Sequence, residues 1–340
     1  MSRQLLLDML TYCRPAGSVA ERAFIDRFIR PLPGAWCDPY DNWHVWIPNA
    51  DNSPSRIVWS CHTDTVHLHS RRQTVSLNPR TGIVRLSRRS RRRGGSTCLG
   101  ADCTVGVYLC VSMIVAQVPG HYIFHYGEEC GGIGSRALAY GWSGLLADAD
   151  IAIALDRRGT GDVITHQYGQ RTASDVFAWS LAEELGRLDA RLVYEPAHGI
   201  YTDTAEYAET IPECTNLSVG NRDEHHATET CDTVHVGRLL AALCELDTDR
   251  LLVDRDPTAP DPDDWRFQSR TVLPFAETID ETIGGSTYAS DNGRAINHED
   301  CPLCGWVAVD GYCTHCGWES QSWYLDRAQA DVQQALRRIK

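Results

Sequence analysis

The chain has 340 residues, of which 43% are hydrophobic and 23% charged, and its formal net charge is -13. This composition is that of an ordinary globular protein and excludes the disordered and fibrous classes. The negative charge argues against nucleic acid as the main partner, because phosphate-binding surfaces are usually basic. No apolar run approaches the ~20 residues that cross a bilayer, and the amino terminus turns polar too soon for a secretory signal. We therefore expect a cytoplasmic protein without membrane contact.

The periodicity of apolar residues alternates between helical and extended patterns along the first 250 residues. Helical spacing predicts helices at 5–12, 17–30, 103–117, 133–141, 173–187 and 235–250. Apolar runs of strand length lie at 43–47, 56–61, 122–126, 151–155 and 215–219. This alternation predicts an α/β fold whose central, mostly parallel sheet is covered by helices on both faces.

Residues 71–93 are rich in arginine, and no acidic residue lies between Asp64 and Asp102. The segment reads as an inserted hairpin or a mobile loop. Either it is a solvated basic loop that offsets the acidic remainder, or it binds an anion or grips the substrate.

The C-terminal part of the sequence has a different character. From Asp254 the chain is rich in Pro and Asp, as an extended linker is. Two Cys-x-x-Cys-Gly motifs follow, a pattern that predicts a structural zinc ribbon with one tetrahedral zinc on Cys301, Cys304, Cys313 and Cys316. The expected organisation is a hydrolase domain at 1–252, a linker at 253–297, the ribbon at 298–320 and an amphipathic helix at 321–340.

Potential metal ligands stand directly after the predicted strands. His62, Glu128, Glu129 and Asp156 each follow a strand, and the carboxyl ends of parallel strands meet at one edge of a sheet. A further segment follows at Glu224-His225, and such a set of two histidines and several carboxylates suits a pair of zinc ions. His62 could bind one ion while Asp64 fixes its tautomer. Asp102 is the natural bridge between the ions.

The adjacent Glu128 and Glu129 point in different directions, so one can bind metal while the other faces the attacking water. Taken singly, a His-x-Asp pair is usually an ordinary hydrogen-bonded pair, and adjacent glutamates are usually a solvated turn. Their occurrence in one order favours the metal-centre interpretation.

In these motifs the sequence resembles the co-catalytic zinc exopeptidase superfamily, which includes leucyl-type aminopeptidases, tripeptidases and glutamate-carboxypeptidase-like enzymes. The resemblance covers about residues 1–250 and rests on Ser60–Val66, Leu99–Asp102, Gly127–Gly131, Asn216–Gly220 and Glu224–Glu229.

The resemblance implies that His62 and Asp156 bind one zinc, that Glu129 and His225 bind the other, and that Asp102 bridges them. It also implies that Glu128 is the general base. His225 is preferred to His226, because the family places a carboxylate four residues after this ligand, which matches Glu229. Asp203 matches a recurrent aspartate near the site.

Three features depart from the family pattern. Cys103 stands where many members have a second acidic residue, and the arginine-rich segment and the ribbon lie outside the pattern. The interval between Asp156 and His225 is too short for a lid domain, so a lidless aminopeptidase is the closer architectural match.

The expected function is hydrolysis of a terminal amide bond of a short peptide by an aminopeptidase-like enzyme with two zinc ions. One alternative is an N-acyl amino acid deacylase or carboxypeptidase, in which the arginine-rich segment grips a carboxylate of an acyl-amino-acid substrate. Another is a non-catalytic adaptor that binds nucleic acid or protein through the ribbon or the arginine-rich loop.

Overall fold

The computed structural model describes residues 2–92 and 95–259 in full, together with the backbone of 298–300 and 307–309. The expected ribbon ligands Cys301, Cys304, Cys313 and Cys316, most of the expected linker, and the expected helix at 321–340 lie outside the described residues. The chain divides into two units, 1–272 and 273–340. In the second unit, β16 (His298–Asp300) and β17 (Val307–Val309) pair antiparallel.

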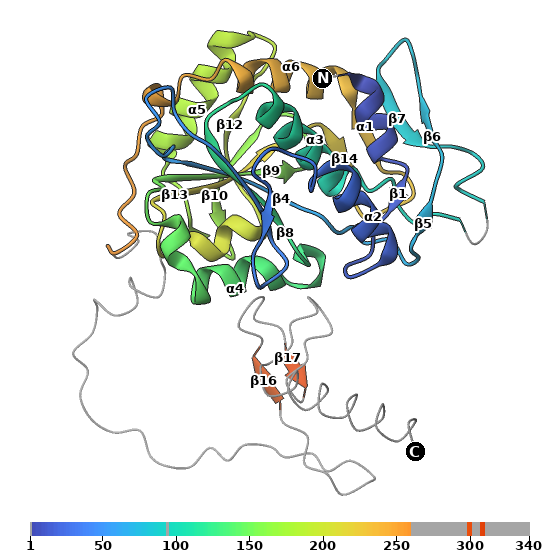
Figure 1. The fold of residues 1–340 in the computed structure, drawn as a ribbon, viewed down its shortest axis with the longest axis horizontal. Coiled ribbons are helices and arrows are strands. Elements are labelled where there is room, and N and C mark those ends of the chain that lie inside the picture. Colours follow the sequence, from blue (N-terminus) through green and yellow to red (C-terminus); the bar gives the residue numbers. More distant parts are fainter. Residues whose placement is uncertain (1, 93–94, 260–297, 301–306, 310–340) are drawn as a thin grey trace, which may run out of the picture. The chain divides into compact units, whose positions relative to one another are not determined.

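A nine-stranded mixed sheet lies at the centre of the first unit (Figure 1). Its order is β11 (Gln170–Arg171), β10 (Asp162–Gln167), β13 (Glu213–Ser218), β9 (Ile151–Arg157), β4 (Ile57–His62), β8 (Gly120–His125), β3 (Trp43–Ile47) and β2 (Trp36–Cys37), with β12 (Glu195–His198) paired to β10. The inner strands β13, β9, β4 and β8 are parallel to one another. Antiparallel pairs flank them on both sides. The predicted α/β fold with a parallel sheet centre is confirmed.

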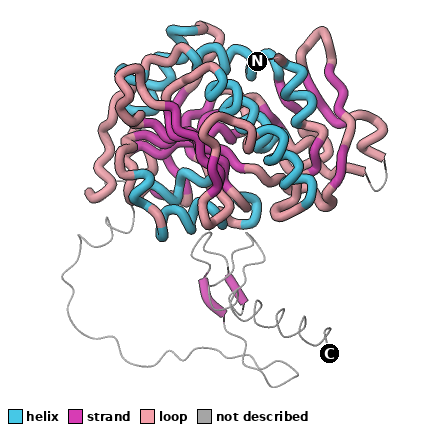
Figure 2. Tube along the Cα trace, viewed as in Figure 1, coloured by secondary structure: helices cyan, strands magenta, loops and turns pink. Residues whose placement is uncertain are grey.

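Helices cover both faces of this sheet, as Figure 2 shows. On one face α3 (Ala101–Val115) packs against β4 and β9, and α1 (Arg3–Met9) and α6 (Thr233–Cys244) pack against α3. On the other face lie α4 (Ile133–Gly141) and the 3-10 helix η3 (Asp203–Tyr207). Neighbouring residues of one strand serve different cores: Trp59 belongs to the larger core and Val58 to the smaller one. This division follows from the two-residue period of a strand.

The remaining helices begin at side-chain caps. Ser18 caps α2 (Val19–Phe28) by accepting the Glu21 N–H at 3.1 Å, and Ser174 caps α5 (Asp175–Leu188) in the same way. These bonds satisfy backbone donors that have no partner within a helix. No helix in the described part of the chain is long and apolar enough to span a bilayer.

The arginine-rich segment forms a hairpin of β6 (Val75–Leu77) and β7 (Ile83–Leu86). Strand β7 also pairs with β15 (Thr230–Asp232), which pairs with β14 (Asn221–Arg222), so that the hairpin completes a four-stranded sheet. Upstream, β5 (Arg71–Arg72) pairs with β1 (Tyr12–Cys13). Of the two alternatives, the structure therefore shows the hairpin. Strands β14 and β15 of the same sheet flank the turn that carries His225.

Candidate metal centre

Five segments bring polar side chains to the carboxyl edge of the sheet. His62 is the last residue of β4, and Asp156 lies at the end of β9. Asp102 lies in the first turn of α3, and Glu129 lies in the 3-10 helix η1 (Glu128–Cys130) after β8. His225 lies in the turn between β14 and β15. The order of strands predicted this convergence, because parallel strands end at one edge.

His62 forms the first half of the cluster. Its Nε2 lies 3.0 Å from Oδ1 of Asp102 and 3.5 Å from Oδ1 of Asp156. Its other ring nitrogen, Nδ1, lies 3.3 Å from Oδ1 of Asp64. The imidazole is 1% exposed. One nitrogen therefore faces the carboxylates of the cleft, while the other faces the buried Asp64.

His225 forms the second half. Its Nε2 lies 3.2 Å from Oδ2 of Asp102 and 3.2 Å from Oε2 of Glu129. The two oxygens of Asp102 thus face two different histidines. His226 points elsewhere, and its Nδ1 lies 2.8 Å from the carbonyl oxygen of Glu224. Of these two adjacent histidines, His225 is the one that joins the cluster.

Asp64 fixes the glutamate pair as well as facing His62. Its carboxylate accepts the backbone N–H groups of Glu128 and Glu129, each at 3.2 Å. Glu128 then points its Oε2 toward His62, 3.9 Å from Nε2. One buried carboxylate therefore orients a histidine from the preceding strand and two glutamates from the next loop.

Glu229 holds the segment that carries Asp102. Its two oxygens accept the N–H groups of Gly100 at 2.8 Å, of Ala101 at 2.7 Å and of Asp102 at 3.2 Å. Gly100 has a φ of 70°, and a Cβ there would lie 2.7 Å from the ring of His67. Both the backbone conformation and the close packing require glycine at this position.

The carboxylates are crowded and buried. Burial raises the pKa of Glu129 to about 7, and the negative charge of Asp102 adds to this effect. Burial also raises the pKa of Glu128 well above its ordinary value, and that of Asp156 with the help of the Asp102 charge. Desolvation penalises the charged form of a carboxyl group, and neighbouring negative charges add to the penalty. A positive charge placed among these groups would relieve both effects.

The two histidines already supply part of that charge. Burial by itself would raise the pKa of Asp102, but the bonds to His225 and His62 outweigh it and hold this pKa below its ordinary value. In return, bonds to Asp102 and Glu129 raise the pKa of His225 to about 11. Asp102 is thus the most anionic group of the cluster.

The donor set fits divalent cations. Buried oxygens of Glu129 (Oε1) and Asp156 (Oδ1) have no hydrogen-bond partner among the described residues. Ligand atoms of His62, Asp102 and Glu129 lie within 4.8 Å of one another, and so do those of His62, Cys103 and Asp156. Nitrogen and carboxylate ligands in such a group are those that zinc takes in catalytic sites.

Two contacts of the cluster were not predicted from the sequence. Thr202 donates from Oγ1 to Oδ2 of Asp156 at 3.1 Å, and Asn216 accepts the Asp156 N–H at 3.2 Å. Asn216 belongs to a motif of the resemblance, but only the fold places it and Thr202 beside Asp156. Asp203 is buried near the cluster, and burial raises its pKa to about 8.

A cleft of about 230 Å³ opens over the cluster. Its walls include, besides the residues of the cluster, Arg157, Arg158, Ile200, Tyr201, Asn216 and Glu224. None of the arginines described between 71 and 92 lines it. The arginine-rich hairpin instead pairs, through β7, with strand β15 that follows the His225 turn.

Solved peptidase structures share this fold. A tripeptidase from Staphylococcus aureus subsp. aureus Mu50 is 13% identical, with a TM-score of 0.56 over 73% of this chain and 97% of that chain. Aminopeptidase PepT from Bacillus cereus ATCC 10987 is 13% identical, with a TM-score of 0.52 over 71% and 97% of the two chains. PhTET1-12s, a dodecamer in its crystal, is 15% identical, with a TM-score of 0.50 over 72% and 98%.

The fold implied by the sequence resemblance is thus confirmed. At these identities the similarity establishes the fold alone. No protein-family model matches the chain, and no curated protein sequence matches it.

Proposed function

We propose that the protein is a metal-dependent exopeptidase that hydrolyses a terminal amide bond of short peptides. The observation that carries this proposal is the position of Asp102, whose Oδ1 lies 3.0 Å from His62 and whose Oδ2 lies 3.2 Å from His225. A carboxylate between two separate imidazoles, each with a further carboxylate beside it, suits a bridging ligand of two cations.

In this proposal His62 and Asp156 would hold one zinc ion, Glu129 and His225 would hold the other, and Asp102 would be a ligand to both. When bound, the two ions would polarise the scissile carbonyl and lower the pKa of a water molecule. Cys103 lies beside the first position, with its Sγ donating to the carbonyl of Leu155 at 3.3 Å.

Glu128 is the proposed general base. It lines the cleft, and its side chain is only 11% exposed, so its carboxylate is reached from the cleft and is largely shielded from bulk solvent. Burial raises the pKa of Glu128, which brings a carboxylate closer to the value at which it can both take and return a proton near neutral pH. Glu128 takes the proton of the attacking water and gives it to the leaving nitrogen.

The names of the structural neighbours support the substrate class. A tripeptidase and an aminopeptidase share the fold, and the cleft is small. We also retain as proposals the structural zinc on the four ribbon cysteines, the linker and helix of the C-terminal part, and a cytoplasmic location.

The first test is zinc content per chain, measured by elemental analysis, in the wild type, His62→Ala and Glu128→Gln proteins. We expect about three zinc ions in the wild type, fewer in His62→Ala, and an unchanged content in Glu128→Gln. Glu128→Gln should lose at least about 100-fold in kcat on tripeptides. A single zinc ion that persists in His62→Ala, or a Glu128→Gln protein with the wild-type rate, would contradict the proposal.

A further inference from the structure

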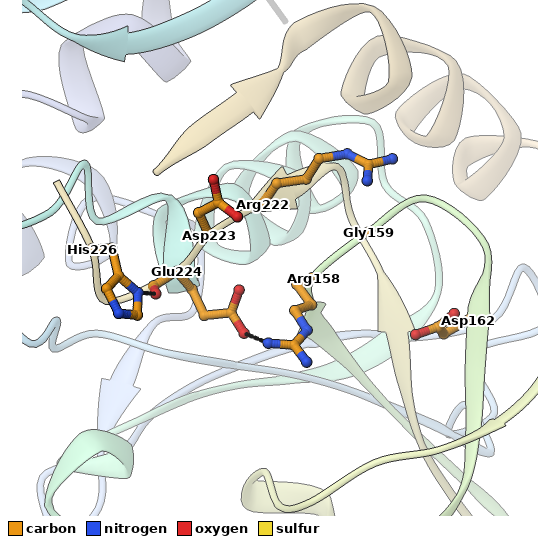
Figure 3. A pocket seen from close by; sticks show the side chains of 7 residues that line it. All are labelled: Arg158, Gly159, Asp162, Arg222, Asp223, Glu224 and His226. Atoms are coloured by element: carbon orange, nitrogen blue, oxygen red, sulfur yellow. Dashed lines mark hydrogen bonds and ion pairs between the residues drawn. The ribbon is translucent and has the colours of Figure 1, made fainter. Parts of the chain in front are cut away.

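A second pocket adjoins the metal cleft. It has a volume of about 400 Å³, and two of its lining residues, Arg158 and Glu224, also line the cleft. Figure 3 shows the rest of its lining, which consists of Gly159, Asp162, Arg222, Asp223 and His226. The Arg158–Glu224 ion pair therefore stands where the cleft and the second pocket meet.

Arg158 directly follows β9, whose last residue is Arg157, and it lines the metal cleft together with Asp156. Arg157, between them, is occupied elsewhere, with its Nε donating to Asp162 at 2.9 Å. Arg158 donates from Nη1 to Oε1 of Glu224 at 2.8 Å.

Arg158 keeps most of its donors available. Its side chain is 55% exposed, and within the described residues the guanidinium has no hydrogen-bond partner besides Glu224. A guanidinium carries five N–H donors in a planar fork, and this fork matches a carboxylate in a bidentate pair. The remaining N–H donors of the Arg158 guanidinium are thus available to bind an anion.

We propose that Arg158 binds the free α-carboxylate of the substrate and that Glu224 positions its guanidinium. This inference rests on the proposed function and names its substrate class: a di- or tripeptide whose carboxylate lies within two residues of the scissile amide. The residue that carries the carboxylate occupies the second pocket, whose charged and polar lining accepts a polar side chain. A long peptide, whose carboxylate lies far from the cleft, lacks this contact.

The test separates binding from turnover. Isothermal titration calorimetry measures the affinity of Ala-Ala-Ala and of its C-terminal amide for the zinc-loaded full chain with Glu128→Gln, which does not consume them. We expect the free acid to bind about tenfold to a hundredfold more tightly than the amide, as a charge-assisted pair does. Adding Arg158→Gln should bring the two affinities to within about twofold of each other.

Further variants identify which side chain recognises the substrate carboxylate. Arg158→Lys should keep part of the preference, because it keeps the charge but loses the fork. Glu224→Gln should weaken the preference without abolishing it. Arg191→Gln removes an exposed arginine that lines neither the cleft nor the second pocket, and it should leave the preference unchanged. Equal zinc content and melting temperature in all variants exclude a folding defect.

Two results would overturn the inference: equal binding of acid and amide by the Glu128→Gln protein, or an acid preference that survives Arg158→Gln. Turnover is judged separately. An acid preference that depends on Arg158, together with a wild-type protein that cleaves no peptide, would refute the proposed hydrolysis and leave the recognition standing.

Discussion

The carboxylate of Glu229 lies directly behind Asp102 and accepts its backbone N–H at 3.2 Å. With the bonds to Gly100 and Ala101, it ties the start of α3 to the segment that follows His225. Glu229 lies four residues after His225, so one short segment supplies a member of the cluster and the support of another. Groups that hold metal ligands in place commonly change affinity by about tenfold to a hundredfold when they are replaced.

Glu229→Gln should therefore weaken zinc binding at the proposed two-metal centre by about tenfold to a hundredfold. Glutamine has the same shape, but its NH₂ group cannot accept a backbone N–H, so at least one of the three donors is left unsatisfied. Competition with a fluorescent chelator would measure the loss. Asp189→Asn, which alters a carboxylate bound to Arg191, is the control and should keep the wild-type affinity. An unaltered affinity in Glu229→Gln would refute this support role.

Asp64→Asn should lower kcat on tripeptides by at least about tenfold. Its carboxylate faces Nδ1 of His62 and accepts the N–H groups of Glu128 and Glu129, whereas asparagine offers only one acceptor oxygen. Steady-state kinetics and zinc content, measured together, locate the effect. Wild-type kinetics in this variant would show that the function of Glu128 and Glu129 does not depend on the carboxylate of Asp64.

Gly106 and Gly237 form a matched pair for a stability test. A Cβ at Gly106 in α3 would lie 2.2 Å from the carbonyl oxygen of Leu155 and 2.5 Å from Sγ of Cys103, so Gly106→Ala should destabilise the protein by about 1–3 kcal/mol. Gly237 in α6 has no atom within 4 Å of such a Cβ, and Gly237→Ala should stabilise by about 0.5–1 kcal/mol. Urea unfolding measures both. Equal effects would mean that α3 does not pack as closely on β9 as described.

Acid should destabilise the protein partly through His121. Burial, helped by the neighbouring His44 and His125, lowers the pKa of His121 well below its ordinary value. Its ring stacks on Trp46 at 3.7 Å and lies 2.9 Å from Nδ1 of His44. Because the unfolded chain binds this proton with a pKa of about 6.5, the contribution is complete above that pH and falls by up to about 1.4 kcal/mol per unit below it.

Urea unfolding of the zinc-loaded protein at pH 7.5, 6.5 and 5.5 tests this expectation. His121→Gln should make the loss of stability between pH 6.5 and 5.5 smaller than in the wild type. His69→Gln, at an exposed position, should leave the pH dependence as it is. A slope that His121→Gln does not change would assign the acid sensitivity to other groups.

The elements of the sheet centre were predictable because their signals are strong and local. The strand predicted at 56–61 overlaps β4, and the strand predicted at 151–155 lies within β9. The helix predicted at 133–141 matches α4. The helix predicted at 235–250 instead begins at Thr233, after its Asp232 cap, and ends at Cys244. Leucines at 246 and 251 continue the apolar pattern beyond its end, so periodicity alone placed the end of the helix too late.

The sheet flanks were harder to predict. Strand β10 (Asp162–Gln167) is almost entirely buried, but its sequence, Asp-Val-Ile-Thr-His-Gln, is largely polar and gave no apolar run. Burial of a polar strand depends on neighbours far along the chain, here β13 and β12. The same limitation applies to Thr202 and Asn216, whose positions beside Asp156 depend on tertiary structure alone.

The two halves of the metal cluster are completed at different times as the chain is synthesised from its amino end. His62, Asp102, Glu129 and Asp156 all precede residue 157, whereas His225 and the supporting Glu229 come about seventy residues later. Strand β7, which pairs with β15 beside the His225 turn, is made long before its partner. Under the proposed assignment of ligands, a nascent chain that ends before residue 225 carries the ligands of one ion but lacks the histidine of the other. Full metal loading would therefore indicate that β15, the strand after the His225 turn, has paired with β7.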